Sequence, residues 1–471
     1  MDDSGGRNAS AATDRIQEAL VDYCSRLRYE DVAGVTAHAA KVRVIDTLGA
    51  LIGGFHGEAC RIARNTAGRF PDPHGATIIG TRFKAPPEMA AFANATASRF
   101  VEGNDIYRWP HSTGGHPSDV IAPILSVAEY ARASGREFVV AVVLAYEVYC
   151  RISDSMDAWG NGVEPANFAC LGVASASARL LGLTPRQIAH AISIAAVSGN
   201  LLRQVRTGHL SVWKAVAAGE AGRAGVFAAM LAREGMEGPS QPFEGKHGWC
   251  HRVAGKPITL GSLGGGDVPF KVGVTLIKPR TACAATIGAI LAAEKVAPAL
   301  ADVSKVSKVT VEVYKNAKVG MGTGEHHWNP DSRETADHSI PYVVAATLID
   351  GTVTPRSFHE ARRTDPRLRQ LLSKIEVAAN EEFTEAYERF PVEHHARVSV
   401  VMADGGRHVG EAGGSRGDLS EQKTDEQIAA KFRALSADVM EIGRANAALE
   451  LLWALDQMEN VAEVAPMLAF C

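Results

Sequence analysis

The sequence predicts a mainly α-helical fold, in which both ends of the chain build a large helical domain that carries an inserted α+β lid domain. Two observations support this fold class. Apolar residues recur at helical spacing through most of the first 270 residues, and abundant alanine and glycine allow helices to pack closely. Alternation typical of a strand begins only at residue 306, and helical spacing returns after residue 423. We therefore expect residues 1–270 and 416–471 to form the helical domain and residues 271–415 to form the lid.

The first part of the chain is predicted to form a series of helices. They cover residues 11–29, 35–55, 86–99, 120–133, 138–153, 171–181, 183–197 and 212–231. Thr184 followed by Pro185 is typical of an N-cap and a first helical position. In the last of these helices, Lys214 lies among apolar neighbours. Its side chain either reaches the surface or, if buried, needs an anion that a bound ligand could supply.

The predicted lid has a different pattern. An alanine-rich helix is expected after Cys283, and the segment VSKVTVEVY at residues 306–314 alternates as a strand does. Residues 396–402 and 408–411 flank the turn sequence ADGG and are expected to form a hairpin. Residues 423–470 return to helical spacing and are expected to rejoin the first domain.

The composition narrows the functional class. Of the 471 residues, 46% are hydrophobic and 22% are charged, as in ordinary globular proteins, and the formal net charge of −4 argues against a nucleic-acid binder. No apolar run in the sequence reaches the length of a membrane span. The polar N-terminus lacks the features of a secretory or transit peptide, so we expect a short disordered tail and a soluble, cytoplasmic protein.

The seven cysteines are scattered, and no two of them follow the CxxC spacing. This pattern is typical of reduced thiols rather than of a disulfide frame. It also disfavours a zinc ribbon or a typical iron–sulfur site, so the sequence predicts no metal centre.

One loop between two alanine-rich segments is crowded with chemical groups. It reads VEGNDIYRWPHSTGGHPSD, at residues 101–119, and its glycines and prolines exclude one long helix. Its last two residues can cap the helix that follows. Glu102, Asp105 and His116 have no such explanation, and functional side chains favour loops held by a rigid scaffold. The same loop also contains His111.

Two later segments place basic and polar groups just before apolar helices. In residues 276–294, Lys278, Arg280 and Cys283 precede a helix whose N-terminus attracts anions. Residues 326–342 bring histidines, an aspartate and a tyrosine to the start of another helix. Together these loops suit the binding of a small polyanion and the transfer of a proton next to a carboxylate. The sequence has no phosphate loop, dinucleotide-binding glycine motif or GxSxG elbow.

Segments spread over nearly the full chain resemble the MmgE/PrpD family, in the family's order. They are VIDTLGALIGG (44–54), NATASRFVEGND (94–105), HPSD (116–119), AYEV (145–148), ARLLGL (178–183), SVWKAVAAGEAGRAG (211–225), NPDSRETADHSIPY (329–342) and AKF (430–432). The ETADHSIPY and HPSD segments are specific to the family, so the chain is identified as a member of it.

The resemblance implies a homodimer whose subunits have a helical domain built from both termini and an α+β lid. Family members include 2-methylcitrate dehydratase, citrate dehydratase, cis-aconitate decarboxylase and an iminodisuccinate epimerase. They use no iron–sulfur cluster, and they act beside a carboxylate on a small di- or tricarboxylate. The resemblance therefore implies a small-molecule substrate of this class, no cofactor, and no nucleic-acid or membrane partner.

The family's functional positions transfer residue by residue. Glu102 and Asp105 match its acidic loop, and His116 matches the histidine of the HPSD segment. Lys278 matches the lid lysine, and Tyr342 matches the tyrosine that follows the DHS motif. The resemblance implies catalytic roles for these residues.

The expected substrate-binding residues are Lys214, Arg280, Cys283, Tyr146 and Glu164. Lys214 matches the family's helix lysine, and the cations Lys214 and Arg280 would hold carboxylates. Glu164 and Cys283 stand where many members have histidine, and a common threonine is replaced by Ile106. Cys283 is explained either as a thiolate, because neighbouring cations lower a thiol pKa, or as an inert, small core residue.

Three functions remain open from the sequence. The first is a cofactor-free lyase that dehydrates a citrate-like or 2-methylcitrate-like acid, with His116 or Lys278 moving the proton and Tyr342 donating to the leaving hydroxyl. The second is decarboxylation of an aconitate-like acid, or epimerisation of an iminodiacid with Tyr146 and Lys278 as opposed bases. The third is a non-catalytic protein that binds carboxylates.

Overall fold

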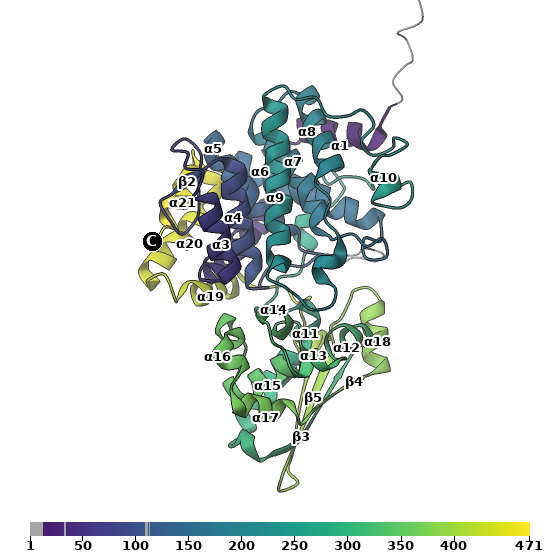
Figure 1. Cartoon of the computed structure of the whole chain (residues 1–471), viewed down its shortest axis with the longest axis vertical. Helices are drawn as coiled ribbons and strands as arrows, with labels where there is room; N and C mark the ends of the chain where they lie inside the picture. The colour runs from purple at the N-terminus through teal and green to yellow at the C-terminus, as the bar shows by residue number, and fades with distance from the viewer. Residues whose placement is uncertain (1–12, 33, 109–111, 113) are drawn as a thin grey trace, which may run out of the picture.

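The computed structural model describes residues 13–32, 34–108, 112 and 114–471 (Figure 1). The predicted N-terminal tail and His111 lie outside these residues. Helices dominate the described chain, and its strands are few and short. The mainly α-helical fold class is therefore confirmed.

The N-terminal helices form the larger body of the molecule. Their bounds are α1 (Arg15–Arg26), α2 (Gly34–Gly54), α3 (Glu58–Ala67), α4 (Pro87–Phe100), α5 (Ile121–Ala131), α6 (Gly135–Ser155), α7 (Ala166–Leu180), α8 (Pro185–Ser198), α9 (Trp213–Arg233) and α10 (Trp249–Arg252). A short ribbon of β1 (Ala76–Thr77) and β2 (Lys84–Ala85) separates α3 from α4 in the chain. Each helix predicted in this region is present, and the largest shift of an end is five residues, at the start of α7.

Helix α9 runs through this body because small residues let its neighbours approach. It packs against α4, α7 and α8. A Cβ atom on Gly219 would lie 2.2 Å from Thr96 Oγ1 of α4, and one on Gly225 would lie 2.6 Å from the Cys170 carbonyl oxygen of α7. Any side chain at these positions would push those helices away. Contrary to the expectation that no apolar run reaches the length of a membrane span, helix α9 is long and apolar enough to cross a membrane. However, 67% of its apolar window is buried inside the protein, as in a core helix.

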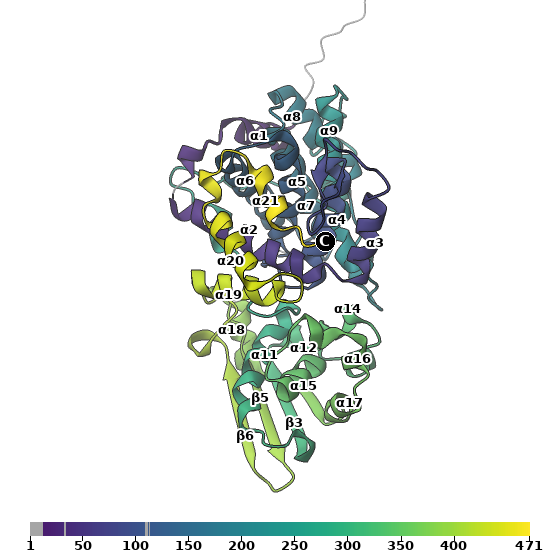
Figure 2. The ribbon, with the colours of Figure 1, turned by 90° about the vertical axis from the view of Figure 1, so that its left-hand side faces the viewer.

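The C-terminal helices return to the helical body, where Figure 2 shows them beside α2. They are α19 (Asp425–Ser436), α20 (Ile442–Trp453) and α21 (Val464–Met467). Helix α19 packs on α2, and its Lys431 donates to Asp46 Oδ1 at 2.6 Å and to the Gly103 carbonyl oxygen at 2.7 Å. Both ends of the chain thus build one helical body, as predicted.

The lid is built on a four-stranded sheet with the order β4–β3–β5–β6. The strands are β3 (Val306–Val313), β4 (Ile375–Ala379), β5 (Ala396–Met402) and β6 (Arg407–Ala412). β3 pairs with β4 in parallel, with Val309 opposite Ile375, and the β3–β5 and β5–β6 pairs are antiparallel. The predicted strand and hairpin are confirmed. Strand β4 was not predicted, because its five residues are too few to show a clear alternation of apolar and polar side chains.

Short and medium helices surround this sheet. They are α11 (Ala284–Val296), α12 (Lys315–Met321), α13 (Glu325–Trp328), α14 (Arg333–Ala336), α15 (Ile340–Asp350), α16 (Glu360–Arg363), α17 (Pro366–Leu372) and α18 (Glu381–Glu388). Helix α11 contacts β5 and β6 and packs on α15. Figure 1 shows the lid at one end of the helical body, with α14 and α11 near the junction. The residue numbers chosen for the domain boundaries stay a prediction.

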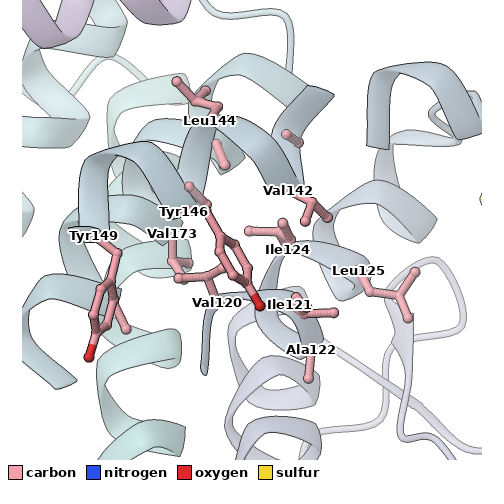
Figure 3. Packing of buried hydrophobic residues seen from close by; sticks show 14 of the residues in the cluster. Val120, Ile121, Ala122, Ile124, Leu125, Val142, Leu144, Tyr146, Tyr149 and Val173 are labelled. Carbon is pink, nitrogen blue, oxygen red and sulfur yellow. The ribbon is translucent and has the colours of Figure 1, made fainter. Parts of the chain in front are cut away.

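The core of the helical body positions a polar loop. Figure 3 shows Tyr146 and Tyr149 of α6 among buried residues of α5, α6 and α7. The Tyr146 hydroxyl donates to Asp105 Oδ2 at 3.1 Å, and the Tyr149 hydroxyl accepts from the backbone N–H of His116 at 3.0 Å. The loop between α4 and α5 is therefore anchored by side chains that are themselves fixed in an apolar core.

Candidate active site

A cavity of about 410 Å³ opens where the helical body meets the lid. Its wall includes Glu102 and His116 from the loop after α4, Lys214 from α9, and Glu164 from the segment before α7. From the lid it includes Cys283, at the start of α11. The structure thus brings five of the predicted site residues together around one cavity.

The carboxylate of Glu102 is the centre of a buried charge network. Arg99 of α4 donates to its two oxygens at 2.8 and 3.1 Å, and the ammonium groups of Lys278 and Lys214 each lie 3.3 Å from it. Burial alone would raise the pKa of Glu102, but these three cations outweigh burial and hold the pKa well below its ordinary range. Glu102 is 2% exposed, so it is a buried carboxylate that stays ionised at neutral pH.

His116 is held as a neutral base. Its Nδ1 lies 2.7 Å from the carbonyl oxygen of Asp105, and because a carbonyl only accepts, Nδ1 carries the hydrogen. Nε2 therefore keeps its lone pair, and it lies 3.6 Å from Glu102 Oε1. Burial, together with the charges of Arg99 and Lys278, lowers the pKa of His116 well below its ordinary value. At neutral pH the imidazole is uncharged and Nε2 can accept a proton.

Asp105 and Tyr146 support this base from behind the cavity wall. Asp105 Oδ2 accepts from the Tyr146 hydroxyl, and Oδ1 accepts from the Ser118 backbone N–H at 3.1 Å. Burial, and then the charge of Asp105, raises the pKa of Tyr146 well above its ordinary value, so the phenol stays protonated and donates. These bonds fix the loop on both sides of His116. Neither side chain lines the cavity.

Lys214 is surrounded by groups from both parts of the protein. Its Nζ lies 3.0 Å from Asp337 Oδ1, 3.1 Å from His338 Nδ1 and 3.3 Å from Glu102 Oε2. Asp337, His338 and Glu102 have the ligand types of a metal site, and their ligand atoms lie within 4.8 Å of one another. Because the Lys214 ammonium already lies within 3.3 Å of all three, the cation that this cluster binds is the lysine.

Lys278 is fully buried and supports Glu102 from outside the cavity. It donates to Glu102 Oε1 and, at 3.1 Å, to the Ala282 carbonyl oxygen. Burial lowers the pKa of Lys278 below its ordinary value, although Glu102 opposes the change. Its side chain is absent from the cavity wall, so the structure places it where it can hold Glu102 rather than touch a ligand.

Arg280 and Tyr342 lie outside the cluster. Arg280 pairs with Glu294, at 2.8 Å from Nη2 to Oε2, and faces a second cavity of about 650 Å³. Tyr342 lies in the first turn of α15, fully buried in the lid core, where its hydroxyl donates to the Ser357 carbonyl at 2.6 Å and its ring stacks on Phe358. The roles expected for Arg280 in substrate binding and for Tyr342 in proton donation therefore have no geometric support.

Glu164 reaches the cavity as part of an ion pair. Arg206 Nε donates to Glu164 Oε1 at 2.7 Å, and both residues line the cavity. Glu164 Oε2 is buried without a hydrogen-bond partner among the described residues. The position predicted to bind substrate thus presents a guanidinium together with its carboxylate, and a guanidinium is well suited to bind a second carboxylate.

Sequence reasoning did not include several residues that the structure brings to the site. Arg99 could have been found, because it lies three residues before Glu102 in a helical segment. Asp119 was interpreted as part of a helix cap, yet it lines the cavity, and burial raises its pKa to about 7. Asp337 and His338 were noted in a polar segment, but without partners. Arg206 carried no recognisable signal.

Two family models match most of this chain. The MmgE/PrpD N-terminal domain matches residues 18–259, and the MmgE/PrpD C-terminal domain matches residues 281–457. A cis-aconitate decarboxylase of Homo sapiens is 25% identical over 478 residues, which cover 96% of this chain and 94% of that protein.

Two bacterial relatives are 2-methylcitrate dehydratases. The protein of Cupriavidus necator is 28% identical over 416 residues, which cover 83% of each chain. The protein of Salmonella typhi is 29% identical over 402 residues, which cover 79% of each chain. Because the two family domains follow each other in order and together span most of the sequence, this chain belongs to the MmgE/PrpD family.

Proposed function

We propose that this protein is a lyase that removes water from a small hydroxy di- or tricarboxylate of the citrate or 2-methylcitrate type, without a cofactor. Family membership and the two kinds of relative support the lyase class. We favour dehydration because His116 presents a neutral imidazole on the cavity wall. Loss of water next to a carboxylate requires a base to break a C–H bond, whereas loss of carbon dioxide does not.

The cavity offers cations for the carboxylates of such a substrate. Arg108, Arg203, Arg206 and Lys214 all line it. A guanidinium binds a carboxylate through two parallel hydrogen bonds, which orients the substrate as well as holding it. The cavity volume of about 410 Å³ falls in the range that suits a small molecule.

The proposed reaction begins at His116. Nε2 takes the proton from the carbon beside a carboxylate, and the cations of the wall stabilise the enolate-like charge that develops there. The imidazolium that forms lies 3.6 Å from Glu102, whose charge stabilises it. Elimination then needs a proton donor for the leaving hydroxyl, because hydroxide is a poor leaving group at neutral pH.

Proton NMR in deuterated buffer tests this proposal. Citrate, 2-methylcitrate, cis-aconitate and iminodisuccinate are each incubated with the purified protein. Vinyl signals from a hydroxy acid would support dehydration. Loss of carbon dioxide from cis-aconitate, or deuterium entering iminodisuccinate without loss of water or carbon dioxide, would contradict it. Ligand-dependent melting without any turnover would favour a non-catalytic carboxylate-binding protein.

The variant His116→Gln tests the base, with His74→Gln as its control. Both change a histidine to an amide of similar size, but His74 is an exposed residue remote from the cavity. We expect His116→Gln to lose turnover and His74→Gln to keep it. Equal turnover in the two variants would remove His116 from the mechanism.

Decarboxylation of a cis-aconitate-like acid is the second candidate. A relative that covers 96% of this chain is a cis-aconitate decarboxylase, and such a reaction could use the same carboxylate-binding wall. Epimerisation has less support, because the bases expected for it, Tyr146 and Lys278, are both absent from the cavity wall. The NMR experiment separates all three reactions.

The proposal also includes a homodimer, on the basis of the family resemblance, and a cytoplasmic location, on the basis of scattered cysteines that are typical of reduced thiols. Light scattering of the purified protein at several concentrations would measure the mass of the particle and so test the homodimer. A mass of one chain at every concentration would contradict it.

A further inference from the structure

Cys283 is placed unlike the other cysteines. It is the N-cap of α11, and its backbone N–H donates to the Asp337 carbonyl oxygen at 3.0 Å, which ties the start of this helix to the residue before His338. Cys283 and His338 both line the cavity. All seven cysteines lie within the described residues, and among them Cys283 alone lines this cavity.

Three side chains are connected in series at this point. The backbone bond to Asp337 brings the Cys283 thiol near the His338 imidazole, whose charge acts on it. His338 Nδ1 lies 2.5 Å from Asp337 Oδ1. Asp337 is anchored in turn by Lys214 Nζ on Oδ1 and Arg333 Nη1 on Oδ2, each at 3.0 Å. A sulfur, an imidazole and a fixed carboxylate thus follow one another from the cavity into the protein, an order that activates thiols elsewhere.

The surrounding charges favour the ionised form of both members of the pair. Burial and Lys214 oppose a positive His338, but Cys283 and Asp337 outweigh them and raise the pKa of the imidazole. Burial likewise opposes a thiolate, but the charge of His338 lowers the pKa of Cys283. In contrast, burial raises the pKa of the other buried thiols, which are Cys24, Cys60, Cys150, Cys170 and Cys250.

We propose that Cys283 and His338 form a thiolate–imidazolium pair that is the acid of this active site, with Asp337 as the positioning residue that holds the imidazole. The role of the pair as an acid rests on the proposed dehydration. The existence of the ion pair does not depend on which reaction the protein catalyses. The reaction still needs a proton donor for the leaving hydroxyl. Cys283 and His338 can supply it, because they line the same cavity as the base His116 but belong to the lid rather than to the helical body.

The proton balance of the step is as follows. His116 Nε2 takes a proton from carbon, and the C–H electron pair becomes the second bond of the alkene. The C–O bond breaks with its electrons on oxygen, and that oxygen takes the proton shared between Cys283 and His338. Water leaves, and the pair remains as a thiolate beside a neutral imidazole. His116 then gives its proton to solvent and the pair recovers one from solvent, so no other reactant is needed.

Titratable groups from every surrounding element face the Cys283 thiol. They are Glu102 from the loop after α4, Lys278 from the segment before α11, Tyr314 after β3, Tyr387 of α18, and His338. Burial raises the pKa of both tyrosines, so they stay neutral in the range of an assay. Glu102 opposes the thiolate, and His338 is the group whose removal tests the pair.

Alkylation by iodoacetamide tests the pair without any substrate. Peptide mass spectrometry follows the labelling of Cys283 between pH 5 and pH 9. We expect half-maximal reactivity below the value of about 8.5 for a free thiol. His338→Gln should move it up by at least a unit, which slows labelling at pH 7 roughly tenfold. Asp337→Asn should move it in the same direction by less, because the imidazole remains.

The fold of each variant is checked in the same samples. Cys24 and Cys170 are buried and stay unlabelled in a folded protein, whereas the exposed Cys471 shows that the reagent is active. A Cys283 that titrates like a free thiol, that is unaffected by His338→Gln, or that stays unlabelled up to pH 9 would overturn the ion pair.

Cys283→Ala tests the acid role with whichever hydroxy acid the protein dehydrates. We expect the loss of water to slow by roughly a hundredfold, while deuterium still enters at the carbon next to the carboxylate, because His116 remains. Water loss at the wild-type rate would overturn the acid role. If the wild-type protein dehydrates no acid, the proposed function fails, and the alkylation result still decides whether the ion pair exists.

Discussion

Replacing Lys214 by methionine removes the ammonium that lies within 3.3 Å of Glu102, Asp337 and His338. Methionine preserves most of the side-chain length and its apolar contacts in α9. Arg99 still pairs with Glu102 and Arg333 still pairs with Asp337. The variant therefore measures what the lysine adds to two carboxylates that each keep one guanidinium.

The structure indicates a large loss of stability. Lys214 and Glu102 are each 2% exposed and Asp337 is 0% exposed, so water screens their interactions very little. Removal of one partner from a buried ion pair costs about 3–5 kcal/mol. Because both carboxylates keep an arginine, we expect the lower end, about 3 kcal/mol of the free energy of unfolding at pH 7.5.

The loss should also depend on pH with a defined sign. In the wild-type protein burial favours the neutral acids, but Lys214 helps to hold the pKa values of Asp337 and Glu102 below their ordinary range. Their contribution to stability is therefore present above the ordinary carboxyl pKa and disappears as pH falls through the lowered values. Without Lys214 these pKa values rise, so the variant loses its carboxylate charges at a higher pH than the wild type, and the difference in stability should not grow between pH 7.5 and pH 5.

Urea unfolding followed by circular dichroism at pH 7.5, 6 and 5 would measure this difference. Lys246→Met is the matched control, because Lys246 is exposed. Adding Asp337→Asn to Lys214→Met should recover part of the loss, because it removes one of the buried charges left short of a partner. A loss under about 1 kcal/mol at pH 7.5, or one that grows as pH falls, would refute the reasoning, since either is outside the range for a broken buried pair.

Three other variants test separate parts of the site. His116→Gln should lower turnover by roughly 10²–10⁴-fold. In the wild-type protein, a pH–rate profile should show kcat/KM rising with pH through the lowered pKa of His116 and becoming level near pH 7. Asp119→Asn should flatten the dependence of stability on pH between 4 and 7, because burial raises the pKa of Asp119 to about 7. Below the pKa of Asp119 in the unfolded chain the neutral acid contributes its full stabilisation, and this contribution is lost as pH rises through 7. If the free energy of unfolding, measured by urea titration, fell with pH as steeply in the variant as in the wild type, the prediction would be contradicted. Tyr342→Phe should keep turnover and lose about 1 kcal/mol of stability, because it removes one hydrogen bond, to Ser357. Loss of turnover with unchanged stability would return Tyr342 to the mechanism.

The helical body could be predicted because its signals are local. Apolar spacing within each helix marks its buried face, and caps mark its ends. At the start predicted for α8, the Thr184 side chain accepts from the backbone N–H of Gln187, and the Gln187 side chain accepts from the backbone N–H of Thr184. The lid was predicted only in outline, because helices as short as α13 or α14 have four residues and show no period. Their positions depend on tertiary contacts that a window of sequence does not contain.

The site was only partly predictable, because its partners are far apart in the chain. Lys214 meets Asp337 across 123 residues, and Lys278 meets Glu102 across 176. A motif identifies the groups, but the fold decides which of them meet. Tyr342 illustrates the difference: it is close to His338 in the sequence, yet the turn at the start of α15 directs it into the lid core while His338 reaches the cavity.

The lysine of the AKF segment explains why the site depends on both ends of the chain. Glu102 has a φ of 57°, in the left-handed region, which costs an L-residue about 1–2 kcal/mol. Gly103 follows Glu102 in the chain, and Lys431 of α19 donates to its carbonyl oxygen at 2.7 Å. Lys431 also donates to Asp46 of α2 at 2.6 Å. A hydrogen bond to a charged group contributes about 1.5–3 kcal/mol, enough to offset that strain. Arg99 holds the carboxylate of Glu102, and Lys431 holds the backbone of the following residue, Gly103. Helix α19 therefore supports the candidate active site although it does not line the cavity.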